Sequence, residues 1–374
     1  MTDFTALPDL ASQRLGGGVV RANDEFFAAA DCLVDPAPPV FQPNSFGPKG
    51  QVYDGWETRR RREPGHDHAI VRLGAPGVVR GVVIDTAYFT GNYPPYASVE
   101  GCGLEGYPSP AELASAPWFP LLSKVALAGD TRNAFTVDGE QRATHVRLSI
   151  YPDGGVARLR VHGEVVPDPR LLGVMPVDLA AMEHGGRVIQ CSNMFYGSPN
   201  NLLLPGLAGT MGEGWETARR RDAGNDWVLI RLGVPGRLRL AELDTSHFKG
   251  NAPGHAALRA IDARVGGLDD ANAWFDLLPR TRLQPDTRHR FVTPAAAEAT
   301  HVRLDVYPDG GMARLRLFGV LAEAELAELA VRWFNLLPAA QALAALAGLT
   351  PHDAQRLVDS RPVPATDLPP QLWK

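Results

Sequence analysis

Hydrophobic and polar residues alternate in many short segments of this chain. Val146, Leu148 and Ile150 alternate with polar neighbours, which predicts a strand with one buried face. Similar runs predict strands at residues 68–73, 78–85, 145–151 and 157–161, and again at 228–232, 238–244, 301–307 and 313–318. Many short strands at this spacing, with few helical stretches, favour antiparallel β-sandwiches.

A Tyr-Pro-Asp-Gly-Gly segment follows one of these runs at residues 151–155 and again at 307–311. Proline presets φ and glycine supplies positive φ, so both segments are typical of tight turns. We therefore expect the strands on either side of each segment to pair as a β-hairpin.

The pattern changes after residue 321. The segment that follows is rich in Ala and Leu with helical periodicity, which Pro338 interrupts. A further short helix is predicted at residues 351–360, with Thr350 as its N-cap. We expect this tail to brace one lobe or a neighbouring subunit rather than to take part in catalysis.

The strand-rich part of the chain occurs twice. Residues 54–77 and 213–236 are identical at 14 of 24 aligned positions, at an offset of 159 residues. The similarity continues in DTAYFTGN and DTSHFKGN, and in THVRLSIYPDGGVARLR and THVRLDVYPDGGMARLR. A repeat of this length indicates a duplicated domain. The predicted organisation is a β-sandwich over residues 1–170, a second over 171–321, and a helical tail over 322–374.

Composition narrows the class of protein. The chain has 374 residues and a net charge of −5, which argues against nucleic acid or an anionic membrane as the main partner. No apolar run is long enough to span a bilayer and no signal peptide is evident, so we expect a cytoplasmic protein. The three cysteines occupy unrelated positions in the two repeats, which indicates reduced thiols.

Each repeat carries a Gly-Trp-Glu-Thr motif followed by arginines. Glu57 and Glu216 occupy the same place in the two motifs, and packing alone explains them poorly because carboxylates are rarely buried without a partner. One explanation is an internal ion pair with the arginines that follow, and the other is a functional site. In the functional explanation, Arg60 and Arg219 suit bidentate capture of a carboxylate or a urea-type carbonyl.

Two further motifs each have a structural and a functional explanation. His66, Asp67 and His68 would place two imidazoles on one side of a strand, which suits a divalent metal, but the second repeat has Asn-Asp-Trp there. A metal site therefore lacks a complete ligand set. Asp85 and Asp244 begin shared Asp-Thr pairs, which could also cap strand ends through bonds to the backbone.

The repeats also differ chemically inside otherwise preserved motifs. Core packing does not require such exchanges of ionisable for neutral groups, so we interpret them as functional asymmetry, in the form of a single site built by both lobes. Surface drift is the alternative. The exchanged pairs are Asp54 and Glu213, Arg59 and Ala218, His66 and Asn225, His68 and Trp227, Tyr88 and His247, and Thr90 and Lys249.

Together these motifs resemble the allantoicase family. The resemblance rests on LASQRLGGGVVRANDEFFA, YDGWETRRRR, HDHAIVRLG, DTAYFTGNYPP, EGWETARRR, DTSHFKGN and YPDGG, and it covers roughly residues 10–320. It implies two jelly-roll, galactose-binding-like β-sandwiches and a homo-oligomer, either a trimer or a hexamer. The reaction that it implies is hydrolysis of allantoate to ureidoglycolate and urea.

This reaction needs groups that activate water toward the central carbon and donate a proton to the departing urea. The candidates for these acid/base roles are Glu57, Glu216, His66, Asp67 and His247. The candidates for binding the substrate are Arg60, Arg219, Asp85, Asp244, Asn92 and Asn251. No cofactor is firmly implied, although a divalent metal is possible. The alternative to an enzyme is a tandem jelly-roll protein that binds a ligand without catalysis.

Overall fold

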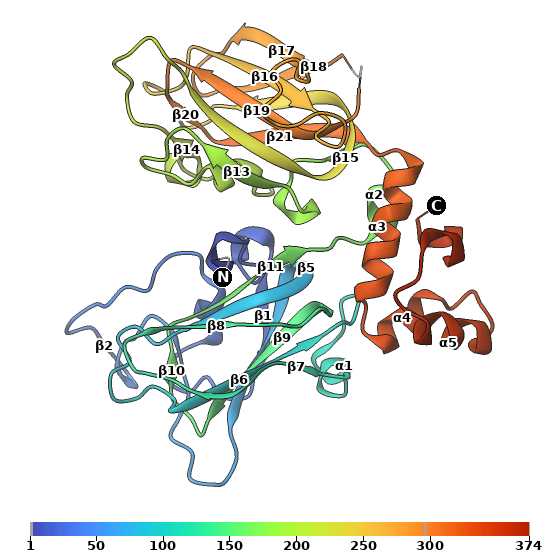
Figure 1. The fold of residues 1–374 in the computed structure, drawn as a ribbon. Helices are drawn as coiled ribbons and strands as arrows, with labels where there is room; N and C mark the ends of the chain where they lie inside the picture. The colour runs from blue at the N-terminus through green and yellow to red at the C-terminus, as the bar shows by residue number, and fades with distance from the viewer. Residues whose placement is uncertain (1–2, 295–296, 374) are drawn as a thin grey trace. The chain divides into compact units, whose positions relative to one another are not determined.

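The computed structural model describes residues 3–294 and 297–373, and antiparallel strands dominate it (Figure 1). By their contacts the residues form two compact units, Met1–Val166 with Arg332–Val363 and Pro167–Val331 with Pro364–Lys374. Each unit contains one copy of the repeat. The expected all-β class with a short helical tail is confirmed. In the described part of the chain, no helix is both long and apolar enough to cross a membrane.

One long strand organises the sheet of the first unit. Through its first half β5 pairs with β1 and β9, and through its second half it pairs with β8 and β11. The two runs predicted as separate strands form one continuous strand, whose pairing with β9 shifts in register between Arg72 and Gly77. The strands are β1 (Gly18–Ala22), β4 (Trp56–Glu57), β5 (Asp67–Asp85), β6 (Tyr96–Cys102), β7 (Phe119–Ala126), β8 (Arg132–Thr136), β9 (Arg142–Tyr151), β10 (Gly155–Val156) and β11 (Arg158–Val165).

The second unit repeats this plan. Its long strand β15 pairs with β13 and β19 through its first half and with β18 and β21 through its second half. The strands are β12 (Val177–Asp178), β13 (Arg187–Cys191), β14 (Trp215–Glu216), β15 (Asp226–Asp244), β16 (His255–Ile261), β17 (Phe275–Arg282), β18 (Arg288–Val292), β19 (Ala299–Tyr307), β20 (Gly311–Met312) and β21 (Arg314–Val320).

The expected hairpins around the Tyr-Pro-Asp-Gly-Gly segments are wrong. β9 and β11 both pair with β5 rather than with each other, and β19 and β21 both pair with β15. Each segment therefore links strands that use different halves of one long strand. Asp67 pairs with Ile150 and Asp85 pairs with Arg158, so a short stretch of chain holds the two ends of β5 at the same edge of the sandwich.

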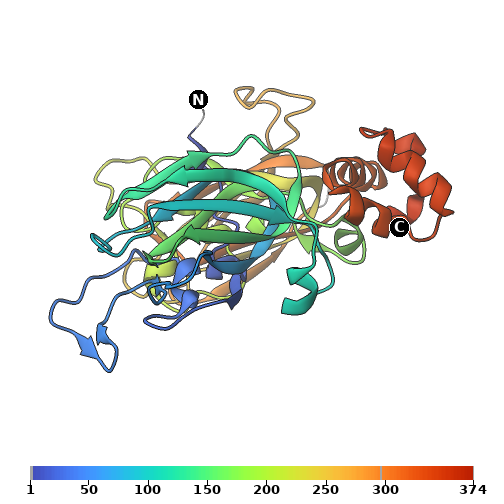
Figure 2. The same cartoon turned by 90° about the horizontal axis from the view of Figure 1, so that it is seen from below.

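The main difference between the units is an inserted hairpin. Ten more residues lie between Val34 and Asp54 than between the aligned Leu203 and Glu213, since 54 − 34 is 20 and 213 − 203 is 10. This longer segment of the first unit contains β2 (Phe46–Gly47) and β3 (Gly50–Gln51), which pair with each other. Figure 2 shows this hairpin projecting from its unit.

The tail is helical, as predicted. It contains α3 (Glu323–Leu336), α4 (Ala339–Ala345) and α5 (Pro351–Asp359), whereas the short helices α1 (Pro110–Ala114) and α2 (Pro169–Leu172) lie earlier in the chain. Pro338 precedes α4, and the Thr350 hydroxyl caps α5 by accepting from the Asp353 backbone N–H. Within the first unit, Gln341 donates to Glu105 at 2.8 Å, so this part of the tail braces the first sandwich as expected. We propose residues 1–170 as the first sandwich, 171–321 as the second and 322–374 as the helical tail.

Candidate functional site

Three repeated motifs meet at one end of each sandwich. In the first unit β4 pairs with β10, which joins Gly-Trp-Glu-Thr to Tyr-Pro-Asp-Gly-Gly. The Gly154 backbone N–H donates to the Thr58 hydroxyl at 3.1 Å, and the Gly155 N–H donates to the Asn92 carbonyl at 2.8 Å. These bonds fix the Phe-Thr-Gly-Asn loop against the other two motifs.

The second unit makes the same contacts. The Gly310 N–H donates to the Thr217 hydroxyl at 3.0 Å, and the Gly311 N–H donates to the Asn251 carbonyl at 2.8 Å. Gly311 is required sterically, because a Cβ there would lie 1.9 Å from the ring of the fully buried Phe248. The motifs are thus held together by backbone bonds and close packing that both repeats share.

This arrangement gives each glutamate an asparagine partner. The Asn92 side chain donates to Glu57 Oε1 at 2.7 Å, and the Asn251 side chain donates to Glu216 Oε1 at 2.6 Å. Burial raises the pKa of the Glu57 carboxyl, and the bond from Asn92 opposes that rise. A half-buried carboxyl group held by an amide is suited to proton transfer.

A cavity of about 330 Å³ opens beside Glu216 in the second unit. Its volume suits a small-molecule ligand. Tyr196 lines the cavity and is 73% exposed, so it lies at the rim, and its backbone N–H donates to the Glu216 carbonyl at 3.2 Å. The lining residues are Tyr196, Gly197, Met211, Gly212, Gly214 and Glu216.

His247 is joined to the segment that lines this cavity. Its Nε2 lies 2.9 Å from the Ala208 carbonyl, and its backbone N–H donates to Asp286 at 2.7 Å. The aligned Tyr88 has a similar positive φ, 66° against 71° for His247, and an equivalent backbone bond to Asp130. The exchange of Tyr for His therefore keeps the backbone and changes the chemistry of the side chain.

The expected arginine–acid pair is present, but its acid is not the motif glutamate. Arg61 contacts Asp67 Oδ1 at 2.6 Å, and Asn23 donates to the same oxygen at 2.8 Å. Arg220 and Asp226 form the matching pair in the second unit, also at 2.6 Å. The predicted ion pair between Glu57 and an arginine is therefore wrong, because Arg61 pairs instead with Asp67, which is buried at the start of β5.

The other candidate residues have different surroundings. Arg60 and Arg219 are exposed, and neither has an ion pair within the described residues, so both are available to a ligand. His66 is exposed, with its ring centroid 4.8 Å from that of Tyr151 and 6.3 Å from that of His68. Among residues 3–294 and 297–373, no group of three or more His, Cys, Asp or Glu is arranged to hold a metal ion.

Asp85 and Asp244 cap the ends of the long strands. Asp85 accepts from the Ala87 backbone N–H at 2.9 Å, and Asp244 accepts from the Ser246 N–H at 2.8 Å. Both are buried, which agrees with the capping explanation. Their role in binding substrate stays a prediction.

Apart from two glycines, sequence reasoning missed two residues of the cavity, Tyr196 and Met211. Tyr196 lies in the weakly similar opening of the second repeat, opposite Phe27 in the first. Both are exposed aromatic residues, although aromatic residues are usually at least partly buried. This shared aromatic position was the available signal. Met211 lies where the repeats differ in length, so alignment gave no signal for it.

Two copies of a β-sandwich, each with a carboxyl–amide pair at the same end, define a tandem-duplicated all-β protein with a site for a small molecule. The family model Allantoicase, described as "Allantoicase repeat", matches residues 8–166 and 177–322. The chain belongs to the allantoicase family.

Individual relatives agree with this assignment. A probable allantoicase from Nocardia farcinica is 59% identical over 321 residues, which cover 85% of this chain and 95% of the relative. A probable allantoicase from Streptomyces coelicolor is 50% identical and covers 88% and 89% of the two chains. The crystal structure of allantoicase from Saccharomyces cerevisiae superposes with a TM-score of 0.73 at 34% identity, covering 83% and 92%. The resemblance seen in the sequence is confirmed.

Proposed function

We propose that this protein hydrolyses allantoate to ureidoglycolate and urea. The observation that carries the proposal is the Glu216–Asn251 pair beside a cavity of small-molecule size, in a chain of the allantoicase family. In the reaction, the bond between the central carbon and one ureido nitrogen breaks and a bond from that carbon to a water oxygen forms. One proton must leave the water and one must reach the departing nitrogen.

Glu216 is the proposed acid/base group. The Asn251 side-chain amide donates to one carboxyl oxygen of Glu216, while the Asn251 backbone carbonyl accepts from the Gly311 N–H, which fixes the loop that carries the asparagine. The second carboxyl oxygen is then free to exchange a proton with water or with the leaving nitrogen. The planar Tyr196 ring at the rim is suited to contact with a flat ureido group.

Arg219 is the proposed anchor of the substrate carboxylate. It is exposed, it lies two residues after the motif that carries Glu216, and Arg220 is already paired with Asp226. A free guanidinium can hold a carboxylate through two parallel hydrogen bonds. Arg60 occupies the equivalent position in the first repeat and is also exposed.

The direct test is to incubate the purified protein with allantoate and to measure urea and ureidoglycolate, with and without a chelator. We expect turnover of allantoate. Its absence in both conditions would refute the proposed hydrolase activity and favour a protein that binds a ligand without catalysis. Loss only with chelator would establish a metal requirement. Glu216→Gln is expected to lower kcat by at least about 100-fold, the usual contribution of acid/base catalysis.

Glu57→Gln is the matched variant in the other repeat. If the repeats have diverged in function, the two variants lose activity to clearly different extents. Equal and partial losses would instead indicate two equivalent sites and would contradict functional asymmetry. Circular dichroism on both variants controls for folding.

We also propose that the protein is cytoplasmic and forms a homo-oligomer, either a trimer or a hexamer. The family resemblance supports the oligomer, and the sequence composition supports the location. Light scattering after size-exclusion chromatography tests the assembly, and a monomeric mass at micromolar concentration would refute it.

A further inference from the structure

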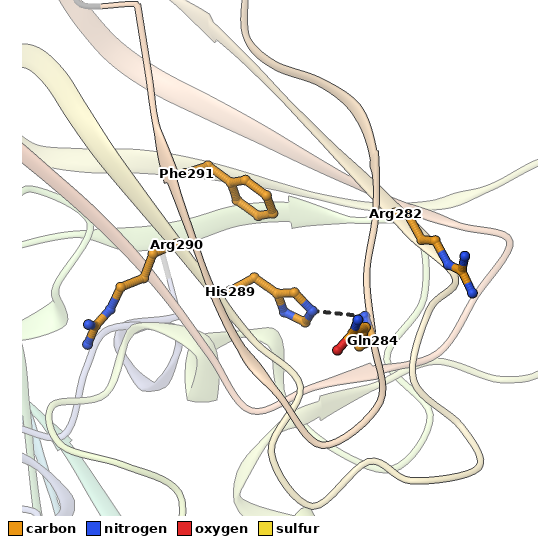
Figure 3. Close-up of a pocket in the computed structure, with 5 residues that line it drawn as sticks. All are labelled: Arg282, Gln284, His289, Arg290 and Phe291. Carbon is orange, nitrogen blue, oxygen red and sulfur yellow. Dashed lines mark hydrogen bonds between the residues drawn. The ribbon is translucent and has the colours of Figure 1, made fainter.

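A second cavity, of about 490 Å³, lies in the second unit beside the loop that joins β17 to β18. Arg282, Gln284, His289, Arg290 and Phe291 line it, and none of them is a candidate for binding allantoate. The rings of His289 and Phe291 are parallel within 4°, with centroids 6.2 Å apart. Figure 3 shows the two rings between Arg290 and Arg282. The cavity thus combines flat ring surfaces with two cationic side chains.

Part of this arrangement is structural and common to both repeats. His289 Nε2 accepts from the Gln284 backbone N–H at 2.8 Å (Figure 3), and its Nδ1 lies 3.0 Å from the Leu243 carbonyl. In the first repeat the aligned Asn133 makes the same two bonds, accepting from the Ala128 N–H at 2.9 Å and donating to a carbonyl of β5 at 3.1 Å. The loop before β18 therefore needs a side chain that both donates and accepts, but it does not need a ring.

The second repeat adds positive charge at two further positions. Arg282 and Arg290 stand where the aligned first repeat, at an offset of 156 residues, has Ala126 and Ala134. Alanine at both positions shows that the strands fold without these side chains. The cationic character of the cavity is thus specific to the second repeat and has no counterpart in the shared scaffold.

The two arginines differ in how far their charge is balanced. Arg290 contacts Glu242 at 2.9 Å, and Arg288 binds the same carboxylate at 2.8 Å. One buried carboxylate thus faces two guanidinium groups. Arg282 is exposed and has no ion pair within the part of the chain that the structure describes. A net positive charge remains at the cavity, most directly on Arg282.

We propose that this cavity binds a small, flat organic carboxylate. The carboxylate pairs with the Arg282 guanidinium, and the planar part of the ligand lies on the surface formed by His289 and Phe291. Arg290 supplies further positive charge from the opposite side. This site is separate from the proposed allantoate site, and no step of the proposed hydrolysis depends on it.

Benzoate is the probe, because it combines a carboxylate with a flat ring. Ligand-observed NMR titration of the full-length protein, without allantoate, is expected to show saturable binding with a dissociation constant of about 1 mM, since the contacts are few. Cyclohexanecarboxylate has the same charge without the flat shape, and benzamide has the shape without the charge. Both are expected to bind at least about fivefold more weakly than benzoate.

Two variants test the residues. Arg282→Ala is expected to weaken benzoate binding at least about tenfold, the usual effect of losing an ionic hydrogen-bond partner. His289→Asn restores the side chain of the first repeat and keeps both backbone bonds, so it removes the ring surface alone and should weaken binding about threefold or more. Arg237→Ala is the control, since Arg237 is an exposed arginine of the same unit that does not line the cavity.

Absence of saturable benzoate binding up to about 20 mM overturns the proposal. So does equal binding by Arg282→Ala and Arg237→Ala, or equal binding of benzoate and benzamide. All variants are expected to keep the melting temperature and allantoate turnover of the parent protein. Failure of this site would therefore leave the proposed hydrolysis untouched, and failure of hydrolysis would leave benzoate binding measurable.

Discussion

Replacing Arg61 by methionine tests whether the arginine run after the first Gly-Trp-Glu-Thr motif is structural or functional. The Asp67 side chain is 1% exposed, and it relies on Arg61 at 2.6 Å and on Asn23 at 2.8 Å. Removing one partner from a buried ion pair costs about 3–5 kcal/mol. Asn23 remains and the Arg61 side chain is 27% exposed, so we expect the lower end, about 3 kcal/mol.

For a unit of this size, a loss of about 3 kcal/mol lowers Tm by roughly 6–12 °C. Differential scanning calorimetry on Arg61→Met should show this shift in the transition of the first unit. Arg60→Met is the matched control, because Arg60 is the exposed neighbour and surface changes usually lie within about 0.5 kcal/mol. We expect Arg60→Met to change allantoate binding instead. A Tm for Arg61→Met within about 1 °C of the parent would refute the structural role assigned to the buried pair.

Three further perturbations follow from burial and packing in the first unit. Burial raises the pKa of the Glu57 carboxyl above its ordinary value of 4.5, so the folded protein loses stability as pH rises from about 4.5 through that raised pKa. Glu57→Gln should therefore raise Tm near pH 7 but not near pH 4. Equal shifts of Tm at the two pH values would contradict this. Burial lowers the pKa of His145 to about 4, so the unfolded chain takes up a proton first as pH drops below about 6.5. The resulting loss of about 3 kcal/mol by pH 4 should disappear in His145→Gln, as followed by urea unfolding at each pH. A Cβ at Gly155 would lie 2.1 Å from the Phe89 ring, so Gly155→Ala should cost about 3 kcal/mol, whereas Gly91→Ala, with nothing within 4 Å, should be nearly neutral in the same assay.

The candidate site shows how far residue types can be predicted without their pairing. The repeated motifs indicate both Glu57 and Asn92 as site residues, but they predict an acid/base role for the glutamate and substrate binding for the asparagine. In the structure the asparagine side chain donates to the glutamate carboxyl. The two residues are 35 positions apart, so local spacing carries no information about this contact. It depends on how the Tyr-Pro-Asp-Gly-Gly segment fixes both motifs.

The arginines illustrate the same limit. Alternation along a strand predicts that some arginine meets a carboxylate, and this is correct. It does not predict which acid, because Asp67 becomes buried only when β5 enters the sheet. Likewise, the strands at residues 145–151 and 157–161 are confirmed, whereas their pairing as a hairpin is wrong.

The sequence by itself determined the duplication, the all-β class, the helical tail with its cap at Thr350, and the family. These features rest on local alternation, on turn and cap chemistry, and on similarity between segments, all of which are readable along one chain. Only the tertiary structure decided the strand partners, the Glu–Asn pairs and the cationic cavity at β17 and β18. Those depend on contacts between residues far apart in sequence, which form when the long strands bury their side chains and must satisfy their backbone groups.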